Sequence, residues 1–303
     1  MKFGALGFSY AGFDHFGRAS QEQGFYTANL GDTAQTVATR GLYRSLGIAE
    51  QDIVVIDRDR LPLYAGEPAV LLMNGVFYGR CFPIPEAITP IFIGFNASAA
   101  VVREHRELLR RHAPIGCRDA ATMAALLENG IDAYVSGCVT MTLPRRVRAP
   151  AGGRLFIVYG AGAGQLPSAV LRHIPPRLMD SAVLLDHRLP VGEFPLSPAS
   201  MGWIERYESH LLNRYRDEAS LVLTPLLHVS SPCLAMGVPV IIARKNHDPR
   251  FSLIGDILPM HAERFEEIDW APEAPGCEAI ARSYRQRVAQ ALRGIGALSP
   301  QQE

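Results

Sequence analysis

His228 stands in the segment of the chain that is best suited to hold an acid–base group. The apolar run Leu221–Thr224 predicts a buried strand, and the two hydroxyls and proline of Ser230–Pro232 indicate the start of a short helix that ends at Gly237. A loop between a strand and a helix places its side chains beside the free N–H groups of that helix, which attract anions. The segment therefore predicts an acid–base histidine beside an anion site; a loop histidine packed in an ordinary βαβ unit is the alternative.

A second candidate, Asp32, stands at the start of a predicted helix and follows Asn29 and Gly31, which are candidate substrate-binding residues. Apolar residues recur at helical spacing after it, and Gly47 closes the pattern. Asp32 with Gln35 three residues later is close to a capping box, and an N-cap of this kind contributes about 1 kcal/mol. Capping the helix is thus a sufficient structural role for Asp32, and a role in chemistry is the functional alternative.

Short apolar runs predict further strands at residues 52–57, 69–73, 90–95, 114–118, 133–135, 154–159, 182–186 and 238–243. Helical patterns alternate with them, which predicts an α/β fold of mainly parallel sheets. Ligands in such sheets bind at the carboxyl ends of the strands, so polar or flexible residues near those ends are candidate binding residues. These are Asn74, Gly75, Arg118, Asp119, Ser136 and Gly137 in the first half of the chain, and His187, Arg188, Thr224, Ser230, Arg244 and Arg250 in the second. A glycine run at 160–164 is a further candidate for holding phosphate.

The segment 143–153 is rich in proline, glycine and arginine and predicts a boundary between two domains, 1–150 and 151–303. Each half repeats its own strand–helix pattern, and the second half ends in an amphipathic helix over 278–293. A length of 303 residues suits two domains of ordinary size. The expected fold is therefore two Rossmann-like domains with a C-terminal helix.

Composition narrows the classes of function. The 30 basic residues balance the 30 acidic ones, which argues against a nucleic-acid-binding protein. No apolar stretch is long enough to span a bilayer, and the N-terminal residues lack the apolar core of a signal peptide, so we expect a cytoplasmic protein without a transmembrane segment. The five cysteines are scattered without metal-ligand spacing, which predicts reduced, buried thiols and no metal site.

Several blocks together resemble the polysaccharide pyruvyl transferase family. The blocks are NLGDTAQ (29–35), MNGVF (73–77), IGCRDAATMAALLENGIDAYVSGCVT (115–140), the region 212–243 and DPRF (248–251), and they span most of the chain in the family's order. The long block at 115–140 is the most specific. The resemblance implies a GT-B-like fold, in which two Rossmann-like domains face each other across a cleft, with the acceptor on the 1–150 side and the donor on the 151–303 side.

The resemblance also implies an activity. Family members move the enolpyruvyl carbons of phosphoenolpyruvate onto two hydroxyls of a sugar, which yields a pyruvate ketal and phosphate in polysaccharide or exopolysaccharide biosynthesis. No cofactor is implied beyond this donor substrate. Arg118 matches the family's anion-binding arginine, His228 matches a histidine that acts as the acid or binds phosphate, and Asp32 matches the aspartate that orients or deprotonates the sugar hydroxyl.

One tetrapeptide departs from the family pattern. The family usually has Ser-Arg-Leu-His where this chain has Pro225-Leu226-Leu227-His228, so Leu226 replaces an arginine expected to hold phosphoenolpyruvate. Either another cation takes its place or the donor differs. The candidate cations are Arg188, Arg244, Lys245 and Arg250.

Two other functions therefore remain open, namely a GT-B-like glycosyltransferase with a nucleotide-sugar donor and a non-catalytic relative. A lipid-linked acceptor would bring the enzyme to the inner face of the membrane, where the basic segment Arg145–Arg148 would make a peripheral contact. A solvated linker is the alternative for that segment.

Overall fold

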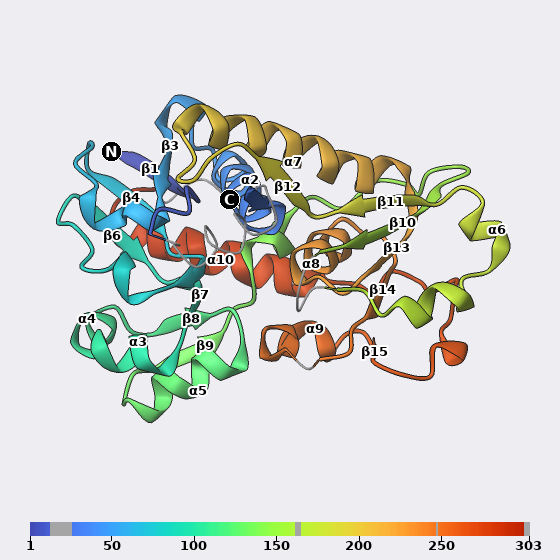
Figure 1. Ribbon diagram of the computed structural model, residues 1–303. Helices are drawn as coiled ribbons and strands as arrows, with labels where there is room; N and C mark the ends of the chain where they lie inside the picture. Colours follow the sequence, from blue (N-terminus) through green and yellow to red (C-terminus); the bar gives the residue numbers. More distant parts are fainter. Residues whose placement is uncertain (13–25, 161–164, 247, 300–303) are drawn as a thin grey trace.

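The computed structural model describes residues 1–12, 26–160, 165–246 and 248–299 (Figure 1). The chain is a mixed α/β protein in which the sheets of more than two strands are parallel. This confirms the prediction of an α/β fold with mainly parallel sheets. No helix within the described residues is both long and apolar enough to cross a membrane. The five cysteines are buried and free, as the sequence predicts.

The first half of the chain builds two four-stranded sheets. One has the order β3-β1-β4-β6 and the other β5-β7-β8-β9. Their strands are β1 (Lys2–Gly7), β3 (Ile53–Asp57), β4 (Ala69–Leu72), β6 (Ile88–Ile91), β5 (Gly75–Phe77), β7 (Ile93–Ala97), β8 (Ile115–Cys117) and β9 (Ala133–Val135). All four residues of β4 are buried, as expected for an apolar run covered on both faces.

Two features of these sheets differ from the sequence prediction. The run 90–95 was expected to be one strand, but the chain leaves β6 at Ile91 and enters β7 at Ile93, so its two parts belong to different sheets. Gly94, inside β7, has a φ of +80°, and the pairing of β7 with β8 is irregular there, between Ile93 and Phe95. The central strand β1 was missed because its sequence, KFGALG, has neither alternation nor flanking turn residues that stand out.

The second half of the chain builds one five-stranded sheet with the order β11-β10-β13-β14-β15. Its strands are β10 (Arg154–Tyr159), β11 (Val183–Asp186), β13 (Ala219–Thr224), β14 (Val240–Ala243) and β15 (Met260–His261). Strands β11 and β13 lie on opposite sides of β10. The chain first passes from β10 to β11 on one side and then returns to β13 on the other side. The strand order therefore has a switch point between β10 and β13, where parallel sheets commonly form a ligand crevice.

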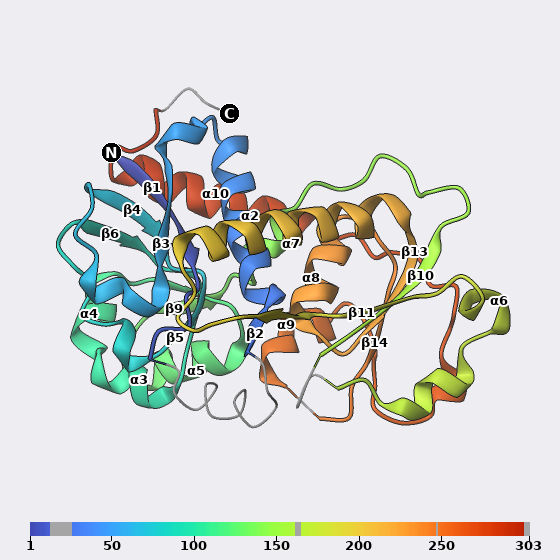
Figure 2. The same cartoon turned by 45° about the horizontal axis from the view of Figure 1, so that its top comes forward.

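Helices cover the sheets and join the two halves. They are α2 (Leu30–Ser45), α3 (Ala99–Glu104), α4 (Arg106–Arg111), α5 (Ala120–Glu128), α6 (Pro176–Met179), α7 (Pro198–Glu218), α8 (Leu227–Ala235), α9 (Ser252–Gly255) and α10 (Glu278–Gly294). The long helix α7 packs on α2 and α8 and runs past both halves (Figure 1). Strand β2 (Tyr26–Asn29) pairs antiparallel with β12 (Arg188–Val191) between them (Figure 2).

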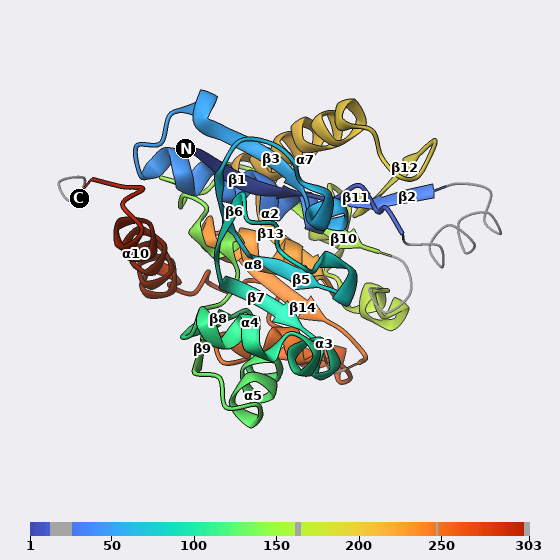
Figure 3. The same cartoon turned by 90° about the vertical axis from the view of Figure 1, so that its left-hand side faces the viewer.

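The C-terminal helix α10 packs against elements of the first half (Figure 3). Its buried residues Val288 and Leu292 join a core cluster that includes Phe3 and Leu42. The Tyr284 hydroxyl bonds to Asn74 Oδ1 and to the carbonyl oxygen of Ile93, each at 3.0 Å. Through these two hydrogen bonds the last helix holds the residue that follows β4 closely and the first residue of β7.

Candidate functional site

A cavity of about 200 Å³ opens at the carboxyl ends of the five-stranded sheet. It lies at the switch point, because Gly160 follows β10 and Leu226 follows β13. Its lining contains seven residues predicted from the sequence, which are Asn29, Gly31, His187, Arg188, His228, Arg244 and Arg250. The structure thus gathers residues from both halves of the chain around one space. The rest of the predicted glycine run, 161–164, lies outside the described residues.

Helix α2 begins at the wall of this cavity. Asn29 is its N-cap, with an extended backbone and a side-chain oxygen that accepts from the N–H of Gly31 at 3.2 Å. The prediction that Asp32 caps this helix is wrong, because β2 runs directly into the helix and places Asp32 in its first turn. The Tyr10 hydroxyl donates to Asp32 Oδ2 at 3.2 Å. Since it caps nothing, the Asp32 carboxylate is held by a side chain and can take part in chemistry.

Gly31 allows the two halves to meet at the cavity. A Cβ atom added there would lie 2.7 Å from His228 Cβ, closer than real carbon atoms approach. Helix α2 contacts α8 along this edge. The glycine of the NLGD block is therefore needed for close packing, and this packing brings the Asp32 segment against His228.

His228, predicted in the loop before the helix, lies at a kink in the first turn of α8, where its φ of −84° and ψ of 16° are not helical. The Thr224 hydroxyl accepts from the N–H of Leu226 at 3.1 Å, so the chain turns at once and the helix begins at Leu227. Ser230, expected at the helix start, instead donates to the carbonyl oxygen of Leu226 at 3.0 Å. The predicted strand–helix connection is therefore present but shorter than expected.

The imidazole of His228 is enclosed and its Nε2 has no hydrogen-bond partner among the described residues. Burial, and after it the nearby guanidinium groups of Arg118 and Arg250, hold the pKa of His228 well below its usual range. At neutral pH, with no anion bound, the ring is therefore neutral. An anion placed beside these groups would raise that pKa and favour the imidazolium.

Arg118 is the most unusual side chain near the cavity. Its side chain is buried, and within the described residues none of its three guanidinium nitrogens finds a hydrogen-bond partner. Burial lowers the pKa of Arg118, and the proximity of Arg250 lowers it further, against the opposing effects of Cys138, Asp119 and Asp32. A buried cation whose hydrogen bonds are not made costs free energy, so this arrangement favours a bound anion. Arg118 does not line the 200 Å³ cavity itself but interacts electrostatically with His228, which does.

The other arginines at the cavity differ in whether their guanidinium groups have a partner. Arg244 and Arg250 both bind Asp248, with Nη2–Oδ2 distances of 2.9 Å and 2.6 Å. Arg188 also lines the cavity, and its guanidinium forms no hydrogen bond or ion pair with any described residue. Leu226 lines it where the family resemblance leads one to expect arginine. Arg188 is therefore a cation of the lining that is available to a ligand.

The remaining predicted residues lie away from the cavity lining and hold the fold. Asp119 caps α5 through a bond from the N–H of Thr122 at 2.9 Å. Ser136 Oγ accepts from the N–H of Gly94 and donates to the carbonyl oxygen of Cys117, both at 3.0 Å. The whole group comprises Asn74, Gly75, Asp119, Ser136, Gly137, Thr224 and Ser230. Asp32 and Arg118 also stand outside the lining but belong to its electrostatic neighbourhood.

Two residues near the site were not predicted. Tyr10 orients Asp32, and its only sequence signal is its place in an aromatic N-terminal segment. Glu208 is fully buried 3.7 Å from His187. Its signal was available, because Glu208 falls on the same helical stripe as Ile204, Leu211 and Tyr215, where an apolar residue is expected.

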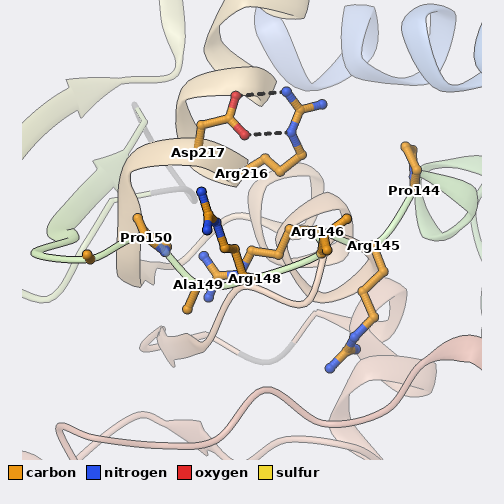
Figure 4. Close-up of a pocket in the computed structure, with 10 residues that line it drawn as sticks. Pro144, Arg145, Arg146, Arg148, Ala149, Pro150, Arg216 and Asp217 are labelled. Atoms are coloured by element: carbon orange, nitrogen blue, oxygen red, sulfur yellow. Dashed lines mark hydrogen bonds and ion pairs between the residues drawn. The ribbon is translucent and has the colours of Figure 1, made fainter.

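A second, larger cavity of about 670 Å³ lies beside the predicted linker (Figure 4). Its arginines are mostly engaged. Figure 4 shows Arg216 joined to Asp217 by two bonds, of 2.7 and 2.8 Å. Arg145 pairs with Glu278 at 3.0 Å, and Arg146 donates to the carbonyl oxygen of Ala219. These cations are already neutralised or anchored, so the smaller cavity is the better candidate site.

The smaller cavity combines the N-terminus of α2, two imidazoles and several guanidinium groups with a carboxylate nearby. Such a set can bind a small ligand with more than one negative charge and can move a proton. No protein-family model matches this chain, and no curated protein matches it either. Function is therefore inferred from the residues themselves.

Proposed function

We propose that this protein is a polysaccharide pyruvyl transferase, which moves the pyruvyl group of phosphoenolpyruvate onto two hydroxyls of a saccharide. The observation that carries the proposal is the buried guanidinium of Arg118 near Nε2 of His228, neither of which has a hydrogen-bond partner among the described residues. A ligand with a phosphate and a carboxylate would satisfy both groups at once. In this proposal the halves form a GT-B-like pair, with the acceptor on the 1–150 side and the donor on the 151–303 side.

The size of the site favours a small donor. Its volume of about 200 Å³ falls below the roughly 300–1,000 Å³ typical of sites for larger ligands. Phosphoenolpyruvate is small enough for such a space, whereas a nucleotide sugar is several times larger. The second anionic group of phosphoenolpyruvate would be held by Arg188, a cation of the lining whose guanidinium has no partner in the described part of the chain. Arg188 would thereby compensate for Leu226.

The reaction requires two hydroxyl protons to be redistributed. The methylene carbon of phosphoenolpyruvate gains a proton and becomes a methyl group as the first sugar oxygen bonds to the neighbouring carbon. The second sugar oxygen then bonds to that carbon as the C–O bond to phosphate breaks with its electron pair. Of the two protons released by the hydroxyls, one replaces the proton given to the methylene carbon and the other leaves on phosphate.

The acidic residue takes up a proton, and the basic residues bind the phosphate. Asp32, held by the Tyr10 hydroxyl, is placed to accept the proton of a sugar hydroxyl. His228 is neutral in the empty site, so its role is to bind phosphate and to become an imidazolium as the phosphate charge approaches. Arg118 stabilises the departing phosphate. The site therefore holds an acceptor of protons on one side and anion ligands on the other.

The direct test is calorimetric binding of phosphoenolpyruvate, with UDP and UDP-sugars measured beside it. We expect saturable binding of phosphoenolpyruvate by the wild type and no binding by Arg118→Ala. Arg216→Ala is the matched control, because Arg216 lies at the other cavity and pairs with Asp217. Nucleotide binding without phosphoenolpyruvate binding would contradict the proposal and indicate a glycosyltransferase. Binding of neither donor would indicate a non-catalytic relative.

A further inference from the structure

Glu208 is a fully buried acidic residue that the proposed reaction leaves unused. It projects from the middle of α7, has no exposed surface, and neither of its carboxyl oxygens has a hydrogen-bond partner in the described parts of the chain. An isolated carboxyl group in this position costs stability and is rare in proteins. A specific role for it is therefore expected.

His187 connects this carboxyl group to the cavity. Its Nε2 is enclosed and lies 3.7 Å from Glu208 Oε1, a gap that a small rotation of either side chain closes to a hydrogen bond. The residue nevertheless lines the cavity beside Arg188. Its backbone is fixed on both sides, because its N–H donates to the carbonyl oxygen of Tyr159 and its carbonyl oxygen accepts from Leu30. The imidazole of His187 therefore lies between the buried carboxyl group of Glu208 and the cavity.

The side chains of Glu208 and His187 both lie in a buried environment. Of the ionisable groups, His187 acts on Glu208, and Glu208 in turn raises the pKa of Tyr215 on the same helix and of Cys233 on α8. On the cavity side, His187 acts on His228. Burial raises the pKa of the Glu208 carboxyl, and the proximity of His187 opposes that rise. Glu208 consequently retains a proton at a higher pH than an exposed glutamate does.

We propose that His187 is the residue that gives and recovers the proton in ketal formation, and that Glu208 is its positioning residue and proton reserve. The proposal rests on the proposed pyruvyl transfer. His228 is less suited to this task because it faces the guanidinium groups of Arg118 and Arg250, whereas His187 faces a carboxyl group. The two histidines therefore divide proton transfer and phosphate binding.

The proton balance closes with this assignment. Glu208 passes its proton to His187, and the imidazolium gives its cavity-side proton to the methylene carbon, whose C=C electron pair forms the new C–H bond. The proton of the first sugar hydroxyl passes through Asp32 to the phosphate that leaves. The proton of the second hydroxyl returns to His187 as its oxygen displaces phosphate. Both residues end as they began.

Kinetics of single and double variants test the assignment. We expect His187→Gln to lower kcat about 100-fold or more and Glu208→Gln about 10-fold, with KM for phosphoenolpyruvate nearly unchanged. The alkaline limb of the kcat–pH profile of Glu208→Gln should move to lower pH, because glutamine stores no proton. The double variant should be no slower than His187→Gln alone. Glu205→Gln is the control, because Glu205 lies on the same helix but pairs with Arg40 at 3.1 Å.

A spectroscopic measurement separates positioning from folding. Nitrogen-15 spectra of the histidine side chains should show His187 with its proton on Nδ1, and Nε2 as acceptor toward Glu208, in the wild type and in Glu205→Gln, and a changed tautomer balance in Glu208→Gln and Glu208→Leu. Thermal unfolding of each variant shows that the native state is populated. A His187 spectrum unchanged in both Glu208 variants would overturn the proposal.

The two proposals fail differently. A wild type that neither binds nor turns over phosphoenolpyruvate overturns the pyruvyl transfer, and the spectra then decide the link between His187 and Glu208 by themselves. A wild type that turns over, with Glu208→Gln equal to Glu205→Gln in kcat and in pH profile, overturns only the role of Glu208. Equal kcat in His187→Gln and the wild type overturns the assignment of the proton donor.

Discussion

The strand ends that hold the fold and those at the candidate site carry similar polar residues but use them differently. At the end of β4, Asn74 is buried and bonded on every side: its Nδ2 donates to Gln35 at 3.0 Å, and its Oδ1 accepts from Val139 at 2.9 Å and from Tyr284 at 3.0 Å. At the candidate site, His228 Nε2 and the whole guanidinium of Arg118 have no partner among the described residues.

This difference separates polar residues that hold the fold from those available to a ligand. A buried polar group with its bonds made is part of the structure, and its loss exposes several partners at once. A buried polar group without partners destabilises the free protein and gains its bonds only when a ligand arrives. Substitutions in the two regions should therefore change stability in opposite directions.

The largest effect is expected at Asn74. Replacement by alanine leaves Gln35, the N–H of Val139 and the Tyr284 hydroxyl without their bonds and opens a small cavity, so Asn74→Ala should lower the free energy of unfolding by about 3 kcal/mol. Urea unfolding measures this change. Phosphoenolpyruvate binding by the fraction that remains folded should be unchanged. A loss of binding at full stability would instead place Asn74 in the ligand site.

Arg118→Met tests the opposite behaviour. It should weaken phosphoenolpyruvate binding at least 100-fold, which is about 2.7 kcal/mol, because the principal anion ligand is gone. The same change should raise the free energy of unfolding of the ligand-free protein by about 1 kcal/mol, since an uncompensated buried charge is removed. Calorimetry and urea unfolding measure the two quantities. Destabilisation together with intact binding would reverse the comparison.

Gly31→Ala probes the contact that joins the two regions. The added methyl group would collide with His228 Cβ, which should lower the free energy of unfolding by about 2 kcal/mol and displace the histidine. Gly41→Ala in the same helix is the control: no atom lies within 4 Å of its added Cβ, so the protein should gain about 0.5–1 kcal/mol. Equal effects of the two substitutions would show that α2 does not press on α8.

The smallest effect concerns pH. The pKa of His228 is lowered in the folded state, so between about pH 6.5 and that lower value the unfolded chain binds a proton that the folded protein does not. Stability contributed by the neutral ring is complete above about pH 6.5 and falls with decreasing pH, by at most about 1.4 kcal/mol per pH unit. Urea unfolding at pH 7.5 and 5.5 should show a smaller loss in His228→Gln than in the wild type. His210→Gln, at an exposed position, should behave as the wild type.

Much of the fold could be predicted because its signals are local. The apolar run 154–159 corresponds to β10 residue for residue, and the runs ending at Asp57, Asp186 and Ala243 end where β3, β11 and β14 end. Gly237, the predicted helix end, has the expected φ of +72°. Each of these features depends on neighbouring residues in the chain, whose backbone preferences and burial pattern are written in a short window.

The candidate site, like the fold, could be predicted only where its signals are local. Residue types and strand–helix spacing pointed to His228, Arg118 and the other polar residues at strand ends, because a chain that alternates strands and helices must bring those ends to one edge of a sheet. Their partners could not be predicted. Asn74 bonds to Tyr284, 210 residues away, whereas Arg118 meets no partner in the described chain, although both directly follow buried strands.

Contacts between distant segments decided the rest. The N-cap of α2 is Asn29 and not Asp32, because β2 pairs with β12 of the other half and runs straight into the helix. Glu208 gained a possible task only because α7 packs beside α8 and turns its carboxyl group toward His187. Short-range patterns set which residues stand at the strand ends. Long-range packing set which of these residues kept a polar atom without a partner in the described chain, and such an atom is available to a ligand.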